Sequence, residues 1–179
     1  GIFTFEVDIT GTISETGTPI SGMMPYINKW PKVRWFLTVM NHGAASIFTA
    51  LRNNESGAKT KFLSELVRIM QKYPWCAGVD IGLERGGGYE NKDAANILFS
   101  DIYQTVKAYN PAKLVNICLP GMTGVQGSVG GENWCVYADL DAYCDTAAIM
   151  SYGMAWAGSA PGPVSPRDWL VGVYDYAIQ

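Results

Sequence analysis

Short apolar runs alternate with stretches of helical periodicity along the chain. Runs with the length and the β-branched or aromatic content of strands cover residues 2–9, 33–39, 77–84, 113–119 and 147–152. Helical spacing and helix-start signals predict helices over 59–72, from Asn91 or Asp93 to Val106, over 136–143, and from Pro166 onward. Strands that alternate with helices indicate a parallel sheet flanked by helices, so the predicted fold class is α/β.

The third predicted strand, residues 77–84, ends in acidic residues. Alternate residues of a strand face the same way, so Asp80, Gly82 and Glu84 share one face and the apolar residues between them share the other. Buried acids are costly unless they are paired or used in chemistry. In a barrel of parallel strands, catalytic groups sit at the carboxyl ends of the strands. Asp80 and Glu84 are therefore candidate catalytic residues.

Each candidate acid also has a purely structural interpretation. The Glu84 carboxylate could form an ion pair with Arg85 or another base, although adjacent strand residues face opposite ways. Asp80 could be a buried acid that backbone or hydroxyl donors satisfy. The glycines at 86–88 lack the spacing and the lysine of a phosphate-binding loop.

Composition narrows the possible partners. With 179 residues, 48% apolar and 16% charged, the chain is predicted to form a single globular domain over residues 1–179. A net charge of −3 without a basic stretch argues against nucleic acid, and no apolar run reaches the roughly 20 residues that membrane insertion requires. His42 is the single histidine, which excludes a multi-histidine metal site, and no metal or other cofactor is expected. The cysteines are predicted to be buried free thiols, with a Cys135–Cys144 disulfide as the open alternative.

The acidic strand resembles the signature of family 18 glycoside hydrolases, the chitinase family. That signature reads Asp-Gly-x-Asp-x-Asp-x-Glu on the fourth barrel strand. Gly78, Asp80 and Glu84 stand at the expected positions, whereas Ala77 and Gly82 replace two of the aspartates. The active-site motif is therefore degenerate.

Further segments extend the resemblance over nearly the whole chain. Residues 149–153 (Ile-Met-Ser-Tyr-Gly) are similar to the sixth-strand motif Met-x-Tyr-Asp, with Gly153 in place of the aspartate. The run 161–166 before Trp169 is similar to the connection into the next helix. Residues 41–43 (Asn-His-Gly) stand where the third barrel strand ends in a loop that faces the substrate.

The resemblance implies a partial (β/α)₈ TIM barrel. The chain corresponds to about strands 2–6, and a closed barrel typically needs about 250 residues. Other segments or subunits are therefore expected to complete the barrel, and in their absence interior apolar residues such as Phe5 and Ile117 are expected to be exposed. A complete open α/β sandwich of five strands is the alternative.

The resemblance also implies a substrate-assisted reaction, in which a glutamic acid protonates the glycosidic oxygen and the substrate's N-acetyl carbonyl attacks the anomeric carbon. Glu84 matches the proton donor, and Tyr152 matches the tyrosine that hydrogen-bonds the acetamide carbonyl. Gly82 replaces the aspartate that orients the acetamide, a loss expected to lower the rate roughly 10²- to 10³-fold. Asp80 is expected to tune Glu84.

Residues at the strand ends supply candidate contacts to a sugar. Tyr89, Trp134 and Trp156 lie in predicted loops where their rings could stack on sugars, with ordinary packing as the alternative for each. The predicted substrate-binding residues are Met150, Trp156, Tyr89 and Asn41.

These features predict a chitinase-like domain that binds an N-acetylglucosamine-containing polysaccharide of cell wall or chitin and is poor in catalysis. The alternative is an active glycoside hydrolase that cleaves β-1,4 N-acetylglucosaminyl bonds with Glu84 as proton donor. The run 156–166 resembles the branch of the family found in phage tail-associated and bacterial cell-wall proteins. That resemblance implies an extracellular, cell-surface or virion location.

Overall fold

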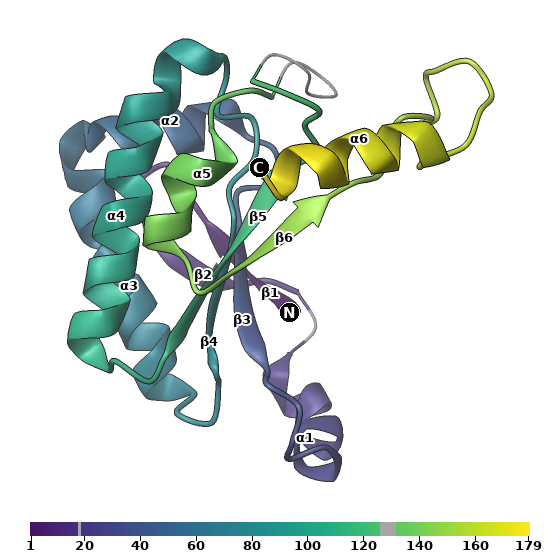
Figure 1. Ribbon diagram of the computed structural model, residues 1–179. Coiled ribbons are helices and arrows are strands. Elements are labelled where there is room, and N and C mark those ends of the chain that lie inside the picture. The colour runs from purple at the N-terminus through teal and green to yellow at the C-terminus, as the bar shows by residue number, and fades with distance from the viewer. Residues whose placement is uncertain (18, 126–131) are drawn as a thin grey trace.

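The computed structural model describes residues 1–17, 19–125 and 132–179. Within these residues the strands form a six-stranded sheet in the order β2-β1-β3-β4-β5-β6 (Figure 1). Its strands are β1 (Ile2–Val7), β2 (Ile13–Glu15), β3 (Phe36–Met40), β4 (Gly78–Gly82), β5 (Leu114–Pro120) and β6 (Thr146–Met150). All neighbouring pairs are parallel except β1 and β2, which form an antiparallel hairpin. The predicted α/β class and its five parallel strands are confirmed, and β2 is an addition that the sequence pattern did not predict.

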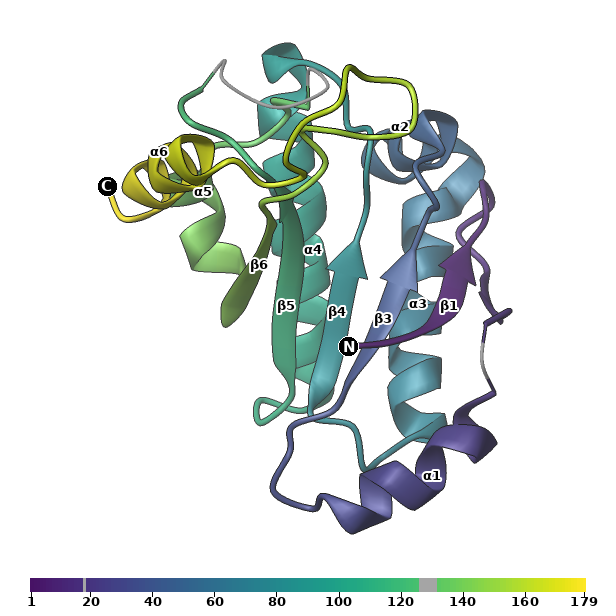
Figure 2. The ribbon, with the colours of Figure 1, turned by 90° about the vertical axis from the view of Figure 1, so that its right-hand side faces the viewer.

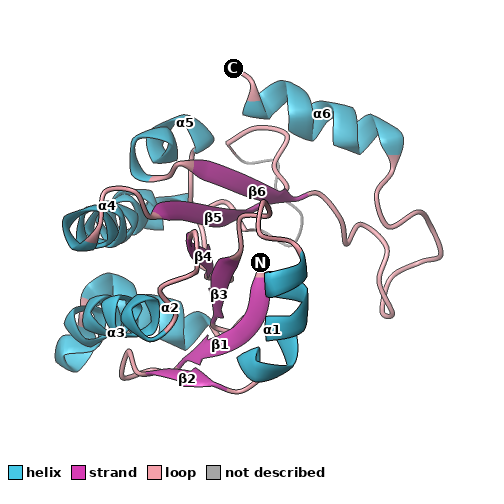
Figure 3. Cartoon of the chain, turned by 90° about the horizontal axis from the view of Figure 1, so that it is seen from below, coloured by secondary structure: helices cyan, strands magenta, loops and turns pink. Residues whose placement is uncertain are grey.

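Helices lie mainly along one side of this sheet. They are α1 (Ile20–Lys29), α2 (Ala45–Asn53), α3 (Ala58–Lys72), α4 (Lys92–Tyr109), α5 (Tyr137–Leu140) and α6 (Arg167–Ala177), with short 3₁₀ turns η1 (Glu55–Gly57), η2 (Tyr89–Asn91) and η4 (Asp141–Tyr143). Helices α2, α3 and α4 lie behind the sheet in Figure 2, and α1 lies beyond the amino ends of the strands. Viewed from below, the strands form a curved layer with α2, α3 and α4 along its outer side (Figure 3).

Strand register separates the two faces of the curved sheet. Parallel pairing places Ile81 beside Ile117 and Asp80 beside Asn116. The apolar residues of β1, β3, β4 and β5 that face the helices are therefore buried in the core, whereas β6 at the edge of the sheet is exposed or half-buried. The polar members face the inner side of the curve.

The same register corrects the expected exposure of Phe5 and Ile117. Both belong to the buried core, with 2% and 0% of their surface exposed. Ile117 shares the helix-covered face with its partner Ile81. A register shift between Phe3 and Phe5 places Phe5 beside Val39, another core residue. The alternation of apolar and polar residues in the sequence does not predict this register shift.

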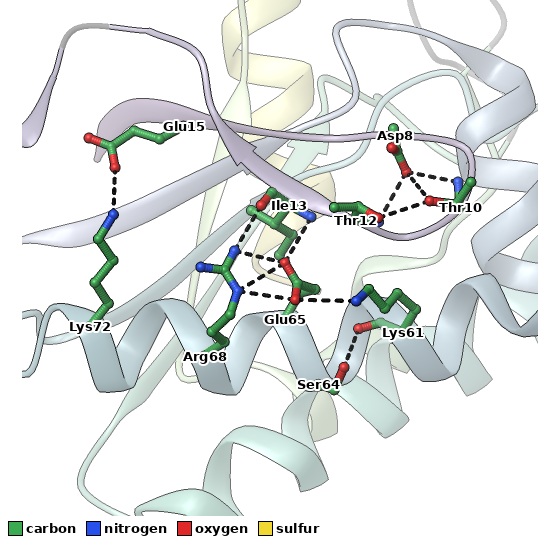
Figure 4. A network of polar contacts seen from close by, with 10 residues as sticks. All are labelled: Asp8, Thr10, Thr12, Ile13, Glu15, Lys61, Ser64, Glu65, Arg68 and Lys72. Atoms are coloured by element: carbon green, nitrogen blue, oxygen red, sulfur yellow. Dashed lines mark hydrogen bonds and ion pairs between the residues drawn. The ribbon is translucent and has the colours of Figure 1, made fainter.

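A polar network fastens the β1–β2 hairpin to α3 (Figure 4). The buried Glu65 carboxylate accepts hydrogen bonds from the Arg68 guanidinium at 2.7 Å and from the Ile13 N–H at 3.3 Å. Arg68 also donates to the Ile13 carbonyl at 2.8 Å. At the turn of the hairpin, Asp8 accepts from the backbone N–H groups of Thr10 and Thr12. The hairpin is therefore held at both its turn and its second strand.

Candidate functional site

Two cavities meet at the carboxyl ends of the parallel strands, and Glu84 lines both. The inner cavity, about 410 Å³, lies over the concave face of the sheet and is bordered by Asp80 and Gly82. The end cavity, about 350 Å³, lies between the loop after β4 and the end of β6, with Arg85 on its wall. Tyr152 also borders both cavities.

Asp80 is buried and fully engaged on the inner face. Its carboxylate accepts hydrogen bonds from the Thr38 hydroxyl at 2.7 Å, the Asn116 amide at 2.6 Å and the Cys118 thiol at 3.3 Å. Burial and the charge of Asp80 raise the pKa of Cys118 to about 12, so the thiol keeps the proton that it donates. Asp80 therefore ties three neighbouring strands together. This arrangement fits the structural interpretation of this acid.

Glu84 has a fixed backbone and a free carboxylate. Its N–H donates to Asn41 Oδ1 at 2.9 Å, and its carbonyl accepts from Asn41 Nδ2 at 2.9 Å. The carboxylate is exposed and forms no hydrogen bond or ion pair with any residue that the structure describes. An ion pair with Arg85 is therefore not seen, and Arg85 itself has a left-handed backbone with φ of 59°.

Asn41 differs from its predicted role. The side chain is 2% exposed, and its amide forms hydrogen bonds with the backbone of Ala44, Glu84 and Gly43. It borders neither cavity that contains Glu84. A buried amide with all its partners inside the protein positions Glu84 and does not face a ligand. This is a correction to the prediction of a substrate-binding Asn41.

Tyr152 and Met150 lie at the carboxyl end of β6. Met150 ends β6 and, like Tyr152, borders both cavities. Burial, followed by the charge of Glu84, raises the pKa of Tyr152. The phenol therefore remains protonated at neutral pH and can donate a hydrogen bond to a ligand oxygen.

The predicted stacking aromatics are scattered. Trp156 and Tyr89 are exposed, but neither borders the two cavities, and Lys92 Nζ lies 5.3 Å from the centre of the Tyr89 ring. Trp134 is 1% exposed and stacks on Phe99, with ring centres 5.5 Å apart. For Trp134 the packing alternative is the observed one, although part of its ring borders the end cavity.

One acid at the site was not predicted from the sequence. Glu132 borders the end cavity together with Glu84 and Arg85. Burial is the main cause of a raised pKa for its carboxyl group. Its only sequence signal is an acidic residue two positions before a buried tryptophan, which no motif singles out.

The chain matches known proteins in structure but not in sequence. No protein-family model matches it, and no curated protein matches it in sequence. The chitinase of Chromobacterium violaceum ATCC 12472 superposes with a TM-score of 0.84 at 18% identity, over 99% of this chain and 55% of the chitinase. The spore cortex-lytic enzyme SleL of Bacillus cereus gives 0.81 at 18% identity, over 98% and 40% of the two chains. The chitinase-like agglutinin RobpsCRA of Robinia pseudoacacia gives 0.77 at 14% identity, over 99% and 58%.

These similarities define the fold class. The chain spans about half the length of the matched structures, and its fold is an α/β fold that forms part of a (β/α)₈ barrel. Because the sequence identities are below 20%, these similarities establish the fold and do not establish an activity or the roles of individual residues.

Over residues 1–17, 19–125 and 132–179, no group of three or more His, Cys, Asp and Glu side chains is arranged to hold a metal ion. None of the helices in the same residues has the length and apolar character needed to cross a membrane.

Proposed function

We propose that the chain is a family 18-like domain that binds an N-acetylglucosamine-containing polysaccharide at the Glu84 end of its sheet. The observation that carries the proposal is the joint placement of Glu84 and Tyr152. Both line the same two cavities at the carboxyl ends of parallel strands, which is where barrel enzymes place their working residues. An exposed carboxylate and a protonated phenol together can hydrogen-bond the donors and acceptors of a sugar.

Hydrolysis by this site is proposed to be weak. The inner cavity has Gly82 where the resemblance calls for an acetamide-orienting aspartate. Asp80 cannot take over that contact, because its carboxylate is already used by Thr38, Asn116 and Cys118. Without charge stabilisation beside the acetamide, the rate is expected to fall by roughly 10² to 10³.

One observation favours the alternative function, an active glycosidase with Glu84 as proton donor. The Glu84 carboxylate is unpaired among the described residues while its backbone is held on both sides by Asn41. A fixed backbone with a free acid is a geometry suited to proton donation.

The setting of the domain forms part of the proposal. We propose that residues 1–179 are one domain whose barrel is completed by other segments or subunits, because the matched structures are about twice as long. The run 156–166 supports a phage tail-associated or cell-wall protein, acting outside the cell, at its surface or on a virion. Similarity to a spore cortex-lytic enzyme is compatible with a bacterial cell-wall polymer.

A binding measurement tests this proposal. The protein should bind a tetramer of N-acetylglucosamine in isothermal titration calorimetry, and a glucose tetramer serves as the control ligand. Glu84→Gln should keep the binding, because a glutamine fills the same space and still forms hydrogen bonds. Absence of binding to the N-acetylated tetramer, or equal binding of both tetramers, would contradict the proposal.

A further inference from the structure

The end cavity contains a carboxyl group, Glu132, that the proposed chemistry does not use. Glu132 follows β5 in the chain and reaches the wall that also carries Glu84 and Arg85. Its Oε2 atom is buried and has no hydrogen-bond partner among the residues that the structure describes. Buried polar atoms in proteins are nearly always paired, so an unpaired carboxyl oxygen at a cavity indicates a group kept for something that binds there.

The surroundings of Glu132 set its protonation. Burial raises its pKa, and the nearby charge of Glu84 acts in the same direction. The positive charge of Arg85 and the backbone N–H groups of Arg85 and Gly86 act against this rise. A carboxyl group in a pocket partly walled by Trp134 is therefore biased toward its neutral form, in which it can both donate and accept a hydrogen bond.

The other wall residues fit a neutral sugar. Tyr152 is exposed at this cavity and supplies a hydroxyl donor, while the buried Leu83 and Trp134 form part of its apolar wall. The volume of about 350 Å³ lies in the range of small-molecule sites. Glu132 borders the end cavity and Gly82 borders only the inner cavity, so Glu132 adds a contact and does not replace the missing aspartate.

We propose that Glu132 is a ligand-binding residue of this site, whose carboxyl group hydrogen-bonds a sugar unit held in the end cavity beside Glu84. The proposal rests on the proposed function, since it assigns a further contact to the same polysaccharide. One oxygen of the carboxyl group is unpaired among the described residues while backbone N–H groups of Arg85 and Gly86 interact with the group, so a glutamine, which keeps an acceptor for them, separates a ligand contact from a structural role.

Calorimetry with the N-acetylglucosamine tetramer, together with thermal unfolding, tests the assignment. Glu132→Leu is expected to bind the tetramer at least about 10-fold more weakly, and to melt at a lower temperature because the backbone N–H groups of Arg85 and Gly86 lose their acceptor. Glu132→Gln, which keeps a hydrogen-bonding group of the same shape, is expected to recover affinity to within about 3-fold. Glu55→Gln, at an exposed glutamate on η1, is the matched control and should change neither quantity.

Each other outcome has a distinct meaning. Tetramer binding that survives Glu132→Leu overturns the assignment and leaves the proposed function standing. A lowered melting temperature in both Glu132 variants makes the residue structural, which also overturns the assignment. If the unmodified protein does not bind the tetramer, the proposed function is wrong, and so is the assignment of Glu132 as a ligand-binding residue.

Discussion

Asn41 joins the ends of β3 and β4 at the point where Glu84 leaves the sheet. Its side-chain amide pairs with both the N–H and the carbonyl of Glu84. Arg85 follows with φ of 59°, a conformation that costs a non-glycine residue free energy. The orientation of Glu84 therefore depends on one buried asparagine.

Removal of the Asn41 amide should weaken the fold locally and globally. Asn41→Ala leaves the Glu84 N–H and carbonyl without their partners, so we expect a loss of about 1–3 kcal/mol in the free energy of unfolding, measured with urea. Asn53→Ala, at an exposed position at the end of α2, is the matched control and should cost less than about 0.5 kcal/mol. Equal effects of the two substitutions would show that the amide bridge does not hold the loop.

Sequence could locate part of this site and not the rest. The period of two along residues 77–84 placed Asp80, Gly82 and Glu84 on one face, and the structure has them around one cavity. Glu132 was missed because its place at the cavity follows from the path of the chain after β5 and not from a local pattern. The sequence predicts that Trp134 lies in a loop where its ring could stack on a sugar, whereas in the fold Phe48 and Phe99 pack against that ring.

At the scale of elements, the strands were easier to predict than the early helices. Parallel strands covered by helices form continuous apolar runs, which stand out in sequence. Helix α1 contains Gly22 and Pro25, and α2 begins after Ala44 without a side-chain cap, so the start signals of both are weak. The three-residue strand β2 is paired with β1 and hydrogen-bonded to α3 through Ile13, and sequence periodicity reports neither contact.

The contact between β2 and α3 should make stability depend on pH in acid. The hydrogen bond from Arg68 is the largest cause of a lowered pKa for Glu65. A carboxyl group whose pKa is lower in the folded state stabilises the fold above its unfolded pKa, and this stabilisation is lost as pH falls through the folded value. Glu65→Gln should therefore cost about 1.5–3 kcal/mol at pH 7, with a difference from the unmodified protein that shrinks below about pH 4.5.

Urea unfolding at pH 7 and at pH 3.5 measures this difference directly. Lys61→Gln is the control, because Lys61 is half exposed and its Nζ lies 3.7 Å from Glu65 Oε1, an ion pair of small value. A difference between Glu65→Gln and the unmodified protein that stays constant with pH would show that the charge of Glu65 does not hold the hairpin.

At the scale of the whole molecule, the described chain is a curved sheet that forms part of a barrel. The concave face carries Asp80, Asn116 and Thr38, and the matched structures continue for about as many residues again. The strand ends that carry Glu84 and Tyr152 are all within the described residues. Both cavities that carry the proposed ligand site therefore lie within this part of the barrel, while a closed barrel interior requires further strands.

Restoration of the missing acid tests the central claim, that this site binds N-acetylglucosamine polymers and lacks the acid for efficient hydrolysis. A Cβ at Gly82 would lie 3.3 Å from Met40 Cγ, a flexible side chain that can shift to admit an aspartate. The measurement is the rate of N-acetylglucosamine tetramer hydrolysis by the unmodified protein, by Gly82→Asp and by Gly82→Asp with Glu84→Gln. We predict little or no hydrolysis by the unmodified protein, a gain of about 10²-fold in Gly82→Asp, and loss of that gain in the double variant. Rapid hydrolysis by the unmodified protein that disappears in Glu84→Gln would contradict the claim.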